Sequence, residues 1–483
     1  MICALVGILV AASSASAAAK KKNVLLFYID DLRAELGCYD VDYIKSPNID
    51  KLASVGVLFE RAYCQQALCG PSRVSMMSGL YPDTTGIMDL WTPLTKAIPN
   101  AMSMPRYFKE RGYVTGSYGK VYHHTRDDTK SWTELIPKPA DKYASKEILD
   151  GIKQRVAEGE RQGLSIDEIR TLGKGPAIEI ADVPDDAFPD GKIANQAIAS
   201  LRKHKDKPFF ICVGFTKPHL PFAAPKRYWD LYDREQFSVP DRERPEGAPS
   251  VAFTVWGELR SYRGMPDEGF LSDAQTKELK HGYAASVSFA DAQVGKVLAE
   301  LDRLGLREDT IVVFWGDHGY KLGEYGAWCK HTNFELDAQV PFIVSAPGFA
   351  KGKRSSALVD IVDIFPTLAT LTGGEIPESL DGKSLDPVLT DPTQSFRPYA
   401  ITMYPRGSVI GYSMRTDRWR YTEWINTSTK EIKIRELYDH QDSAVATKNL
   451  ASNPEYQELM EDLSKQLNSK QRVESTPVRK KKK

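Results

Sequence analysis

Short apolar runs that alternate with helical patterns constrain the fold of this chain more than any other feature. Residues 23–29, NVLLFYI, include no alternating polar positions, so both faces of the corresponding strand are expected to be buried. Residues 283–304 carry apolar side chains at helical spacing, and Gly305 follows as a stop signal. Strand patterns like the first recur at residues 113–118, 209–215, 310–315 and 342–345. This alternation predicts an α/β fold with a large, mostly parallel central sheet flanked by helices.

The pattern of expected strands and helices changes near residue 395. With 483 residues, the chain is too long for one simple core, so a large domain and a smaller one are expected. Residues 20–395 contain the strand–helix alternation. Residues 396–469 contain short strand patterns and a final helical pattern, which predict a small antiparallel α+β subdomain. Residues 470–483 are basic and lack periodicity, so we expect a disordered tail.

Two further segments are predicted to lie outside the sheet. Residues 138–170 are polar and helix-prone, which favours a peripheral insertion. Residues 234–266 are rich in Pro, Arg, Glu and Gly, which is typical of a long surface loop.

The first 19 residues have the pattern of a signal peptide. An apolar run is followed by small residues that end in Ala15-Ser16-Ala17-Ala18-Ala19. The run is too short to cross a bilayer, and no other stretch is long and apolar enough, so no stable membrane insertion is expected. No basic residue precedes Lys20, and a buried helix is the alternative. We expect export to the periplasm, the cell exterior or a lysosome-like lumen.

Charge and cysteine content exclude several classes of protein. Lys plus Arg and Asp plus Glu are equal at 64 each, so no global field would attract nucleic acid. Recognition of anions must therefore be local. The six cysteines include no CxxC pair of the kind that binds zinc, and their number and spacing do not suggest a disulfide scaffold.

Polar residues follow four of the predicted strands where each strand ends. The carboxyl ends of parallel strands share one edge of a sheet, which is where ligands bind in such folds. Carboxylates suit calcium or magnesium better than zinc, although one Asp of an adjacent pair could instead cap a helix. The residues at these ends are Asp30-Asp31, then Lys120 and His123, then Lys217 and His219, and finally Asp317-His318.

The strongest local signal is Cys69-Gly-Pro-Ser-Arg73. Pro71 fits the first turn of a helix, so Cys69 would lie at a helix N-terminus, where free N–H groups favour an anion. Arg73, one turn later, could reach the same anion with its planar guanidinium. The residues by themselves are also compatible with an activated thiolate.

This motif and the strand-end residues resemble the type I sulfatases of the alkaline-phosphatase superfamily, and above all their iduronate-2-sulfatase-like members. The family signature is Cys-x-Pro-Ser-Arg, which Cys69 to Arg73 match at every fixed position. The resemblance extends over residues 23–450. Segments that carry it include Asp30-Asp-Leu-Arg33, Gly119-Lys-Val-Tyr-His123, Lys217-Pro-His219, Gly316-Asp-His-Gly319 and Lys330-His-Thr-Asn333.

The resemblance implies a role for each matching residue. Cys69 would be oxidised to formylglycine, whose hydrate is the nucleophile, by a formylglycine-generating maturation enzyme. Arg73 and Lys120 would neutralise the charge of the sulfuryl group. Lys330 and His219 would protonate the leaving group, and His123 would deprotonate the second hydroxyl of the hydrate. The Ca²⁺ ligands would be Asp30, Asp31, Asp317, His318 and modified Cys69, although His318 suits a hard cation poorly and is an alternative hydrogen-bond partner of the nucleophile.

The resemblance further implies a hydrolase that releases sulfate from a sulfated oligosaccharide or polysaccharide, with 2-O-sulfated uronate as the leading substrate. Residues 20–395 would be its catalytic domain. Tyr320, Trp328 and His331 are candidate sugar contacts, with packing as the alternative role. Arg33, Lys321 and Arg406 are candidate partners of a sugar carboxylate. The rival functions are a phosphomonoesterase or phosphodiesterase of the same superfamily and a non-catalytic sulfated-glycan-binding protein.

Overall fold

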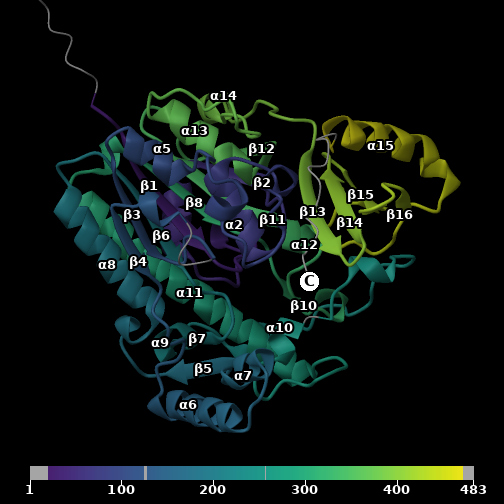
Figure 1. The fold of residues 1–483 in the computed structure, drawn as a ribbon, viewed down its shortest axis with the longest axis horizontal. Coiled ribbons are helices and arrows are strands. Elements are labelled where there is room, and N and C mark those ends of the chain that lie inside the picture. The colour runs from purple at the N-terminus through teal and green to yellow at the C-terminus, as the bar shows by residue number, and fades with distance from the viewer. Residues whose placement is uncertain (1–19, 124–127, 256, 472–483) are drawn as a thin grey trace, which may run out of the picture.

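The computed structural model describes residues 20–123, 128–255 and 257–471 (Figure 1). The predicted signal peptide, residues 1–19, lies outside the described residues, as do residues 472–483 of the predicted tail. Within the described residues, no helix combines the length and the apolar character needed to cross a membrane.

An eight-stranded sheet forms the centre of the protein. Strand β11 runs antiparallel to both of its neighbours, and every other pair of neighbouring strands in this sheet is parallel. The expected α/β class with a mostly parallel sheet is therefore confirmed. The strand order is β12 (Lys353–Asp360), β2 (Val57–Tyr63), β11 (Gln339–Ser345), β8 (Thr310–Gly316), β1 (Asn23–Ile29), β6 (Phe209–Phe215), β3 (Val114–Gly119) and β4 (Glu134–Pro137).

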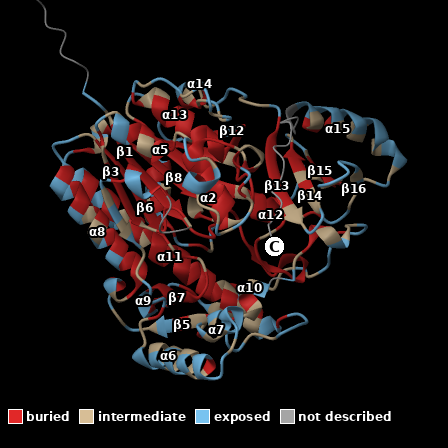
Figure 2. Ribbon diagram, viewed as in Figure 1, coloured by how far each residue is buried: buried red, intermediate tan, exposed pale blue. Residues whose placement is uncertain are grey.

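Helices cover both faces of this sheet, which is why β1 has no exposed residue (Figure 2). Side chains of β1 alternate between two cores, with Phe27 on one face and Tyr28 on the other. The first face packs against α1 (Pro47–Ala53), α8 (Pro189–His204) and α11 (Asp273–Arg303). The second packs against α2 (Cys69–Ser78), α5 (Met104–Glu110), α13 (Ile364–Leu371) and α14 (Asp386–Thr390).

The C-terminal residues form a four-stranded antiparallel sheet, as expected. Helix α15 (Gln457–Gln471) covers it by packing Leu463 and Leu467 against Met414 and Tyr421. The helix therefore extends two residues into the segment that was expected to begin the tail. The strands are β13 (Ala400–Arg406), β14 (Val409–Arg415), β15 (Trp419–Asn426) and β16 (Ile432–Asp439), in that order.

A buried carboxylate joins the small sheet to the large one. Glu335, in the short helix α12 (Glu335–Ala338), accepts hydrogen bonds from Arg415 Nε at 3.0 Å, Arg420 Nη2 at 2.6 Å and Tyr63 Oη at 2.7 Å. Tyr63 belongs to β2, so this cluster connects β14 and β15 with the central sheet.

The two segments predicted to lie outside the sheet, residues 138–170 and 234–266, lie below α11, and the residues that follow the first segment contact the second (Figure 1). Residues 138–176 contain α6 (Lys146–Arg161) and α7 (Ile166–Leu172), and β5 (Ile178–Ala181) then pairs with β7 (Phe222–Pro225). The second segment is mostly irregular but contains α10 (Gly257–Arg260). Arg263 donates its backbone N–H to Gly175 at 3.0 Å and forms an isolated bridge with Pro176.

Candidate active site

The acidic residues predicted at strand ends converge at the carboxyl edge of the sheet. Strands β1 and β8 are paired with Ile29 opposite Gly316, so Asp30 and Asp317 leave the sheet side by side. Asp31 has a φ of 62°, a left-handed conformation that turns the chain sharply after the strand. Its N–H donates to Asp317 Oδ1 at 3.1 Å, which fixes the two acidic segments to each other.

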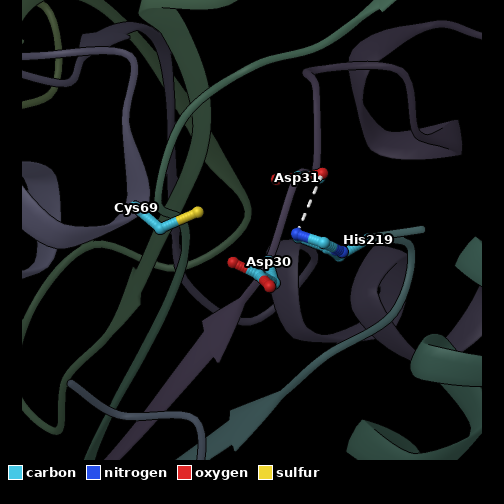
Figure 3. Close-up of side chains that lie close together, drawn as sticks. All are labelled: Asp30, Asp31, Cys69 and His219. Carbon is cyan, nitrogen blue, oxygen red and sulfur yellow. Dashed lines mark ion pairs between the residues drawn. The ribbon is translucent and has the colours of Figure 1, made fainter. Parts of the chain in front are cut away.

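Cys69 begins helix α2 and lies beside these acids (Figure 3). Its Sγ is 3.2 Å from His318 Nε2, so of the two expected roles of His318 this distance fits contact with residue 69. Ser72, in the first turn, donates to the carbonyl of Asp317 at 2.5 Å. A side chain at Gly70 would lie 2.7 Å from the Asp89 carbonyl oxygen, so glycine allows the helix start to approach the 89–91 loop.

Two cations neutralise the acids from within the protein. Arg73 binds Asp317 through Nε at 2.8 Å and Asp30 through Nη2 at 2.9 Å, while Lys120 binds Asp30 at 2.5 Å. Burial favours the neutral acid, but Lys120 and Arg73 hold the pKa of Asp30 well below its ordinary value. The site therefore holds ionised groups of both signs with almost no exposure to water.

Lys330 and His219 lie beside Asp31. Lys330 Nζ is 2.9 Å from both carboxylate oxygens of Asp31, and His219 Nε2 is 4.0 Å from Asp31 Oδ2 (Figure 3). Burial opposes the charge of Lys330, but Asp31 and Glu258 raise the pKa of its ammonium well above its ordinary value.

The sequence alone did not identify Glu258, although it is central to this group. Its carboxylate lies 2.7 Å from Lys330 Nζ and 3.0 Å from His219 Nε2, and it comes from α10 in the irregular second segment. Burial would raise the pKa of Glu258, but Lys330 and His219 hold it well below its ordinary value. Glu258 therefore ties the two expected proton donors together.

His123 lies at the far side of the site, next to an exposed tryptophan. Its Nδ1 is 3.0 Å from the Leu90 carbonyl oxygen, and its ring meets Trp91 edge-on at 5.9 Å. Burial and the charge of Lys120 lower the pKa of His123 to about 3, so the ring is neutral at physiological pH.

The three expected sugar contacts differ in their surroundings. Tyr320 is fully buried, stacks on Tyr283 at 5.6 Å and donates its hydroxyl to Cys329 Sγ at 3.3 Å. Trp328 belongs to the same apolar cluster, so both rings pack in the core, and Lys330 Nζ lies 5.9 Å from the centroid of the Tyr320 ring. Only His331 is partly exposed, with a φ of 88°, and its carbonyl accepts a hydrogen bond from Arg406.

The donor atoms fit a hard divalent cation. One potential ligand set consists of Asp30, Asp31, Cys69 and His219, and the other of Asp30, Cys69, Asp317 and His318, with the ligand atoms of each set within 4.8 Å of one another. Each set contains two buried carboxylates, and the two sets together contain three, namely Asp30, Asp31 and Asp317. Carboxylate oxygens are the preferred ligands of calcium and magnesium.

Comparison with known proteins places this geometry in a family. Residues 22–374 match the family model described as Sulfatase, and residues 323–473 match the model described as N-sulphoglucosamine sulphohydrolase, C-terminal. Iduronate 2-sulfatase of Homo sapiens is 35% identical over 488 residues, which cover 84% of this chain and 86% of that protein. A sulfatase of Formosa agariphila is 30% identical over 457 residues, covering 91% and 85%.

Solved structures share the fold at lower identity. The phosphonate monoester hydrolase of Agrobacterium radiobacter superposes with a TM-score of 0.75 at 21% identity, over 93% of this chain and 95% of its own. A 2-O GAG sulfatase superposes with a TM-score of 0.68 at 22% identity, over 93% and 92%. Because the sequence matches span most of the chain, the resemblance predicted from the Cys69 motif is confirmed, and the protein belongs to the sulfatase family of sulfuric ester hydrolases.

Proposed function

We propose that this protein hydrolyses a sulfate ester of a glycan, with residue 69 as the nucleophile and 2-O-sulfated uronate as the leading substrate. The observation that carries the proposal is the position of Cys69, at a helix N-terminus between three carboxylates and two buried cations. Curated relatives that act on sulfate esters cover most of the chain, including an iduronate 2-sulfatase and an ulvan-active sulfatase.

Two groups complete this site in the proposal. Asp30, Asp31, Asp317 and residue 69 would hold a calcium ion, with His318 alongside them, and its charge would favour oxyanion formation at residue 69. Formylglycine, made from Cys69 by a maturation enzyme, would supply two hydroxyls on one carbon. One would attack sulfur and the other would allow sulfate to be expelled.

Arg73 and Lys120 are the groups that would hold the sulfuryl oxygens. Arg73 is fixed by two carboxylates and by the Lys120 and Val121 carbonyls, so its guanidinium cannot turn away from residue 69. Charges held rigidly in a dry site stabilise a transition state more than mobile charges in water do.

Lys330 and His219 would protonate the leaving oxygen of the sugar. An alkoxide is a poor leaving group, so a proton donor near the departing oxygen lowers the barrier. Glu258 keeps both donors in place and favours the charged form of Lys330. Glu258 is therefore a positioning residue in this scheme.

Two imidazoles would serve residue 69 in different protonation states. Burial opposes a charge on His318, but Asp317 and Cys69 raise its pKa to about 10, so its protonated ring would donate to residue 69. His318 Nε2 lies 3.2 Å from Cys69 Sγ, and His123 is neutral at physiological pH. In this scheme His123 removes the proton of the second hydroxyl when sulfate leaves.

Arg406 supports a carboxylated sugar as the substrate. Arg33 is already paired with Glu35 and Glu324, and Lys321 with Asp337, so neither cation is available. Arg406 contacts the His331 carbonyl, but its buried Nε has no hydrogen-bond partner among the described residues. A uronate carboxylate near His331 would satisfy that donor.

Three further parts of the proposal depend on the sequence. The first 19 residues would direct export, and the partners would be a sulfated glycan and the maturation enzyme. Residues 20–395 would be the catalytic domain, 396–469 the C-terminal subdomain, and the basic residues that follow a disordered tail.

Release of sulfate from defined substrates tests the proposal. We expect turnover of a 2-O-sulfated uronate disaccharide to exceed that of a 6-O-sulfated hexosamine disaccharide. Hydrolysis of an aryl sulfate alone would refute the glycan substrate but leave sulfatase chemistry intact. Faster hydrolysis of a phosphate or phosphonate ester than of any sulfate ester would favour the rival function, which the fold shared with phosphonate monoester hydrolases makes worth testing. Tight binding of the disaccharides without sulfate release, by protein shown by mass to carry formylglycine, would favour a glycan-binding role.

A further inference from the structure

A group of lysines without carboxylate partners lies beside the proposed site. Strand β4 pairs with β3 in parallel, with Pro137 opposite Gly119, so Lys138 leaves the sheet next to Lys120. Neighbouring strands are about 4.8 Å apart, so the backbones of these two lysines start close together. Lys138 thus lies at the same carboxyl edge of the sheet as Lys120, one of the two residues proposed to bind the sulfuryl group.

Two more lysines extend this group toward Glu258. Lys142 precedes Tyr143, whose hydroxyl donates to the Pro176 carbonyl at 2.7 Å and whose ring packs on Gly175. Lys174 therefore lies across from Lys142. Its Nζ donates to Ser261 Oγ and stands 4.7 Å from the Tyr262 ring centroid, next to the helix that carries Glu258.

These lysines lack the partners that other surface lysines have. Within residues 20–123, 128–255 and 257–471, Lys138 and Lys142 form no hydrogen bond or ion pair, and Lys174 contacts only neutral groups. Lys146, by contrast, pairs with Asp150 at 2.5 Å. Burial and the charge of Lys120 lower the pKa of Lys138 to about 7, as expected for a cation that lacks a counter-ion.

An exposed aromatic ring borders the same group. Trp91 is 59% exposed, lies edge-on to His123 at 5.9 Å and carries the Arg170 guanidinium 5.2 Å from its ring centroid. Arg170 belongs to α7, close in sequence to Lys174. The Trp91 ring presents an apolar face and a polar edge next to His123, a combination that suits contact with a sugar ring.

We propose that Trp91, Lys138, Lys142 and Lys174 form a second saccharide subsite, which binds a neighbouring sugar that carries its own sulfate or carboxylate group. The ring of Trp91 packs on the sugar face, and the lysines bind its anionic group. This inference rests on the proposed glycan sulfatase function and narrows the substrate to a glycan with at least two anionic groups.

Equilibrium binding to the full-length Cys69→Ala variant, measured by calorimetry in the presence of calcium, tests the subsite without turnover. Two disaccharides are compared, one with the target ester alone and one with a second sulfate on the adjoining sugar. We expect the disulfated ligand to bind on the order of tenfold more tightly. Lys138→Gln/Lys142→Gln should remove most of that preference. The control Lys146→Gln/Lys153→Gln, on exposed positions of α6, should keep it.

Trp91→Ala should weaken binding of both disaccharides by a similar factor, and Trp91→Phe should recover most of it. Equal binding of the two disaccharides by the parent, or an unchanged preference in the lysine variant, would overturn the proposal. Inorganic sulfate binding at the lysines as tightly as the disaccharide would also overturn it, in favour of a free-anion site. Sulfate release by the Cys69 enzyme is measured separately. A binding preference without sulfate release would contradict the proposed function, and sulfate release without a preference would contradict the subsite.

Discussion

Replacing Glu335 with Gln should destabilise the junction between the two sheets. Glu335 is 3% exposed, and its two arginine partners, Arg420 and Arg415, are 1% and 6% exposed. The amide of Gln keeps one acceptor oxygen but brings N–H donors toward two guanidinium groups and removes the only charge that balances them within the described cluster. Removing one partner of a buried ion pair costs about 3–5 kcal/mol.

The expected loss of unfolding free energy at Glu335 is large compared with the loss at an exposed ion pair. Asp417, whose side chain is 84% exposed, pairs with Arg61 at 2.8 Å, and such pairs contribute only about 0–1 kcal/mol. Asp417→Asn is therefore the matched control, because it removes the same charge near the same junction. The two variants differ in burial and in the number of partners that lose the charge, since Glu335 binds Arg415, Arg420 and Tyr63 while Asp417 binds Arg61.

Urea unfolding followed by fluorescence and limited proteolysis measures the effect. In the Glu335→Gln variant, the four-stranded sheet and α15 should unfold at a lower urea concentration than the central sheet, because the cluster joins the two. A free energy of unfolding within about 1 kcal/mol of the wild-type value would show that Glu335 does not balance the arginines.

Three other predictions concern the active site and the pH dependence of stability. Cys69→Ser should abolish sulfate release with little change in the unfolding midpoint, and wild-type turnover by a variant that mass spectrometry shows to be unmodified would contradict the hydrate mechanism. Removing divalent cations should abolish turnover, and calcium should restore it better than zinc, because three carboxylates form the site; full activity of the metal-free enzyme would refute this assignment. Burial raises the pKa of Glu436 to about 7 although Trp424 and Tyr438 donate to it, so its folded pKa exceeds the unfolded one and its contribution to stability is lost as the pH rises through 7. The unfolding temperature of Glu436→Gln should therefore rise relative to that of the wild type when the pH is changed from 5 to 8. An equal difference between the two proteins at both pH values would refute the linkage.

Fully buried strands were the easiest part of the fold to predict. All seven residues of β1 and of β6 are buried, and all of them except Asn23 are apolar, aromatic or small, so their composition marks both strands. Strand β2 was missed because Glu60 and Arg61 interrupt its apolar pattern, and both are only partly buried there. Helix α11 begins ten residues before its apolar pattern because Ser272 and Gln275 form a capping box ahead of a polar first stretch.

Some residues of the candidate site could also be predicted from the sequence and others could not. Acids and cations at strand ends could be predicted because sheet topology brings those ends together whatever the loops do. Glu258 could not, because its position depends on how an irregular segment packs against His219 and Lys330. For Tyr320 the structure favours the alternative role. Its place near a strand end suggested a sugar contact, with packing as the alternative, and its buried ring packs on Tyr283.

The contact between the two segments outside the sheet has a consequence for engineering. Arg263 binds the backbone of Gly175 and Pro176, and Lys174 binds Ser261, so each segment stabilises the other rather than the sheet alone. A chimera that receives only one of them from a relative would lose these bonds and misplace Glu258. Transferred as a pair, residues 138–176 and 234–271 behave as one cassette, so recombination can exchange the saccharide-facing surface while the strand-end acids and the residue 69 helix stay in place.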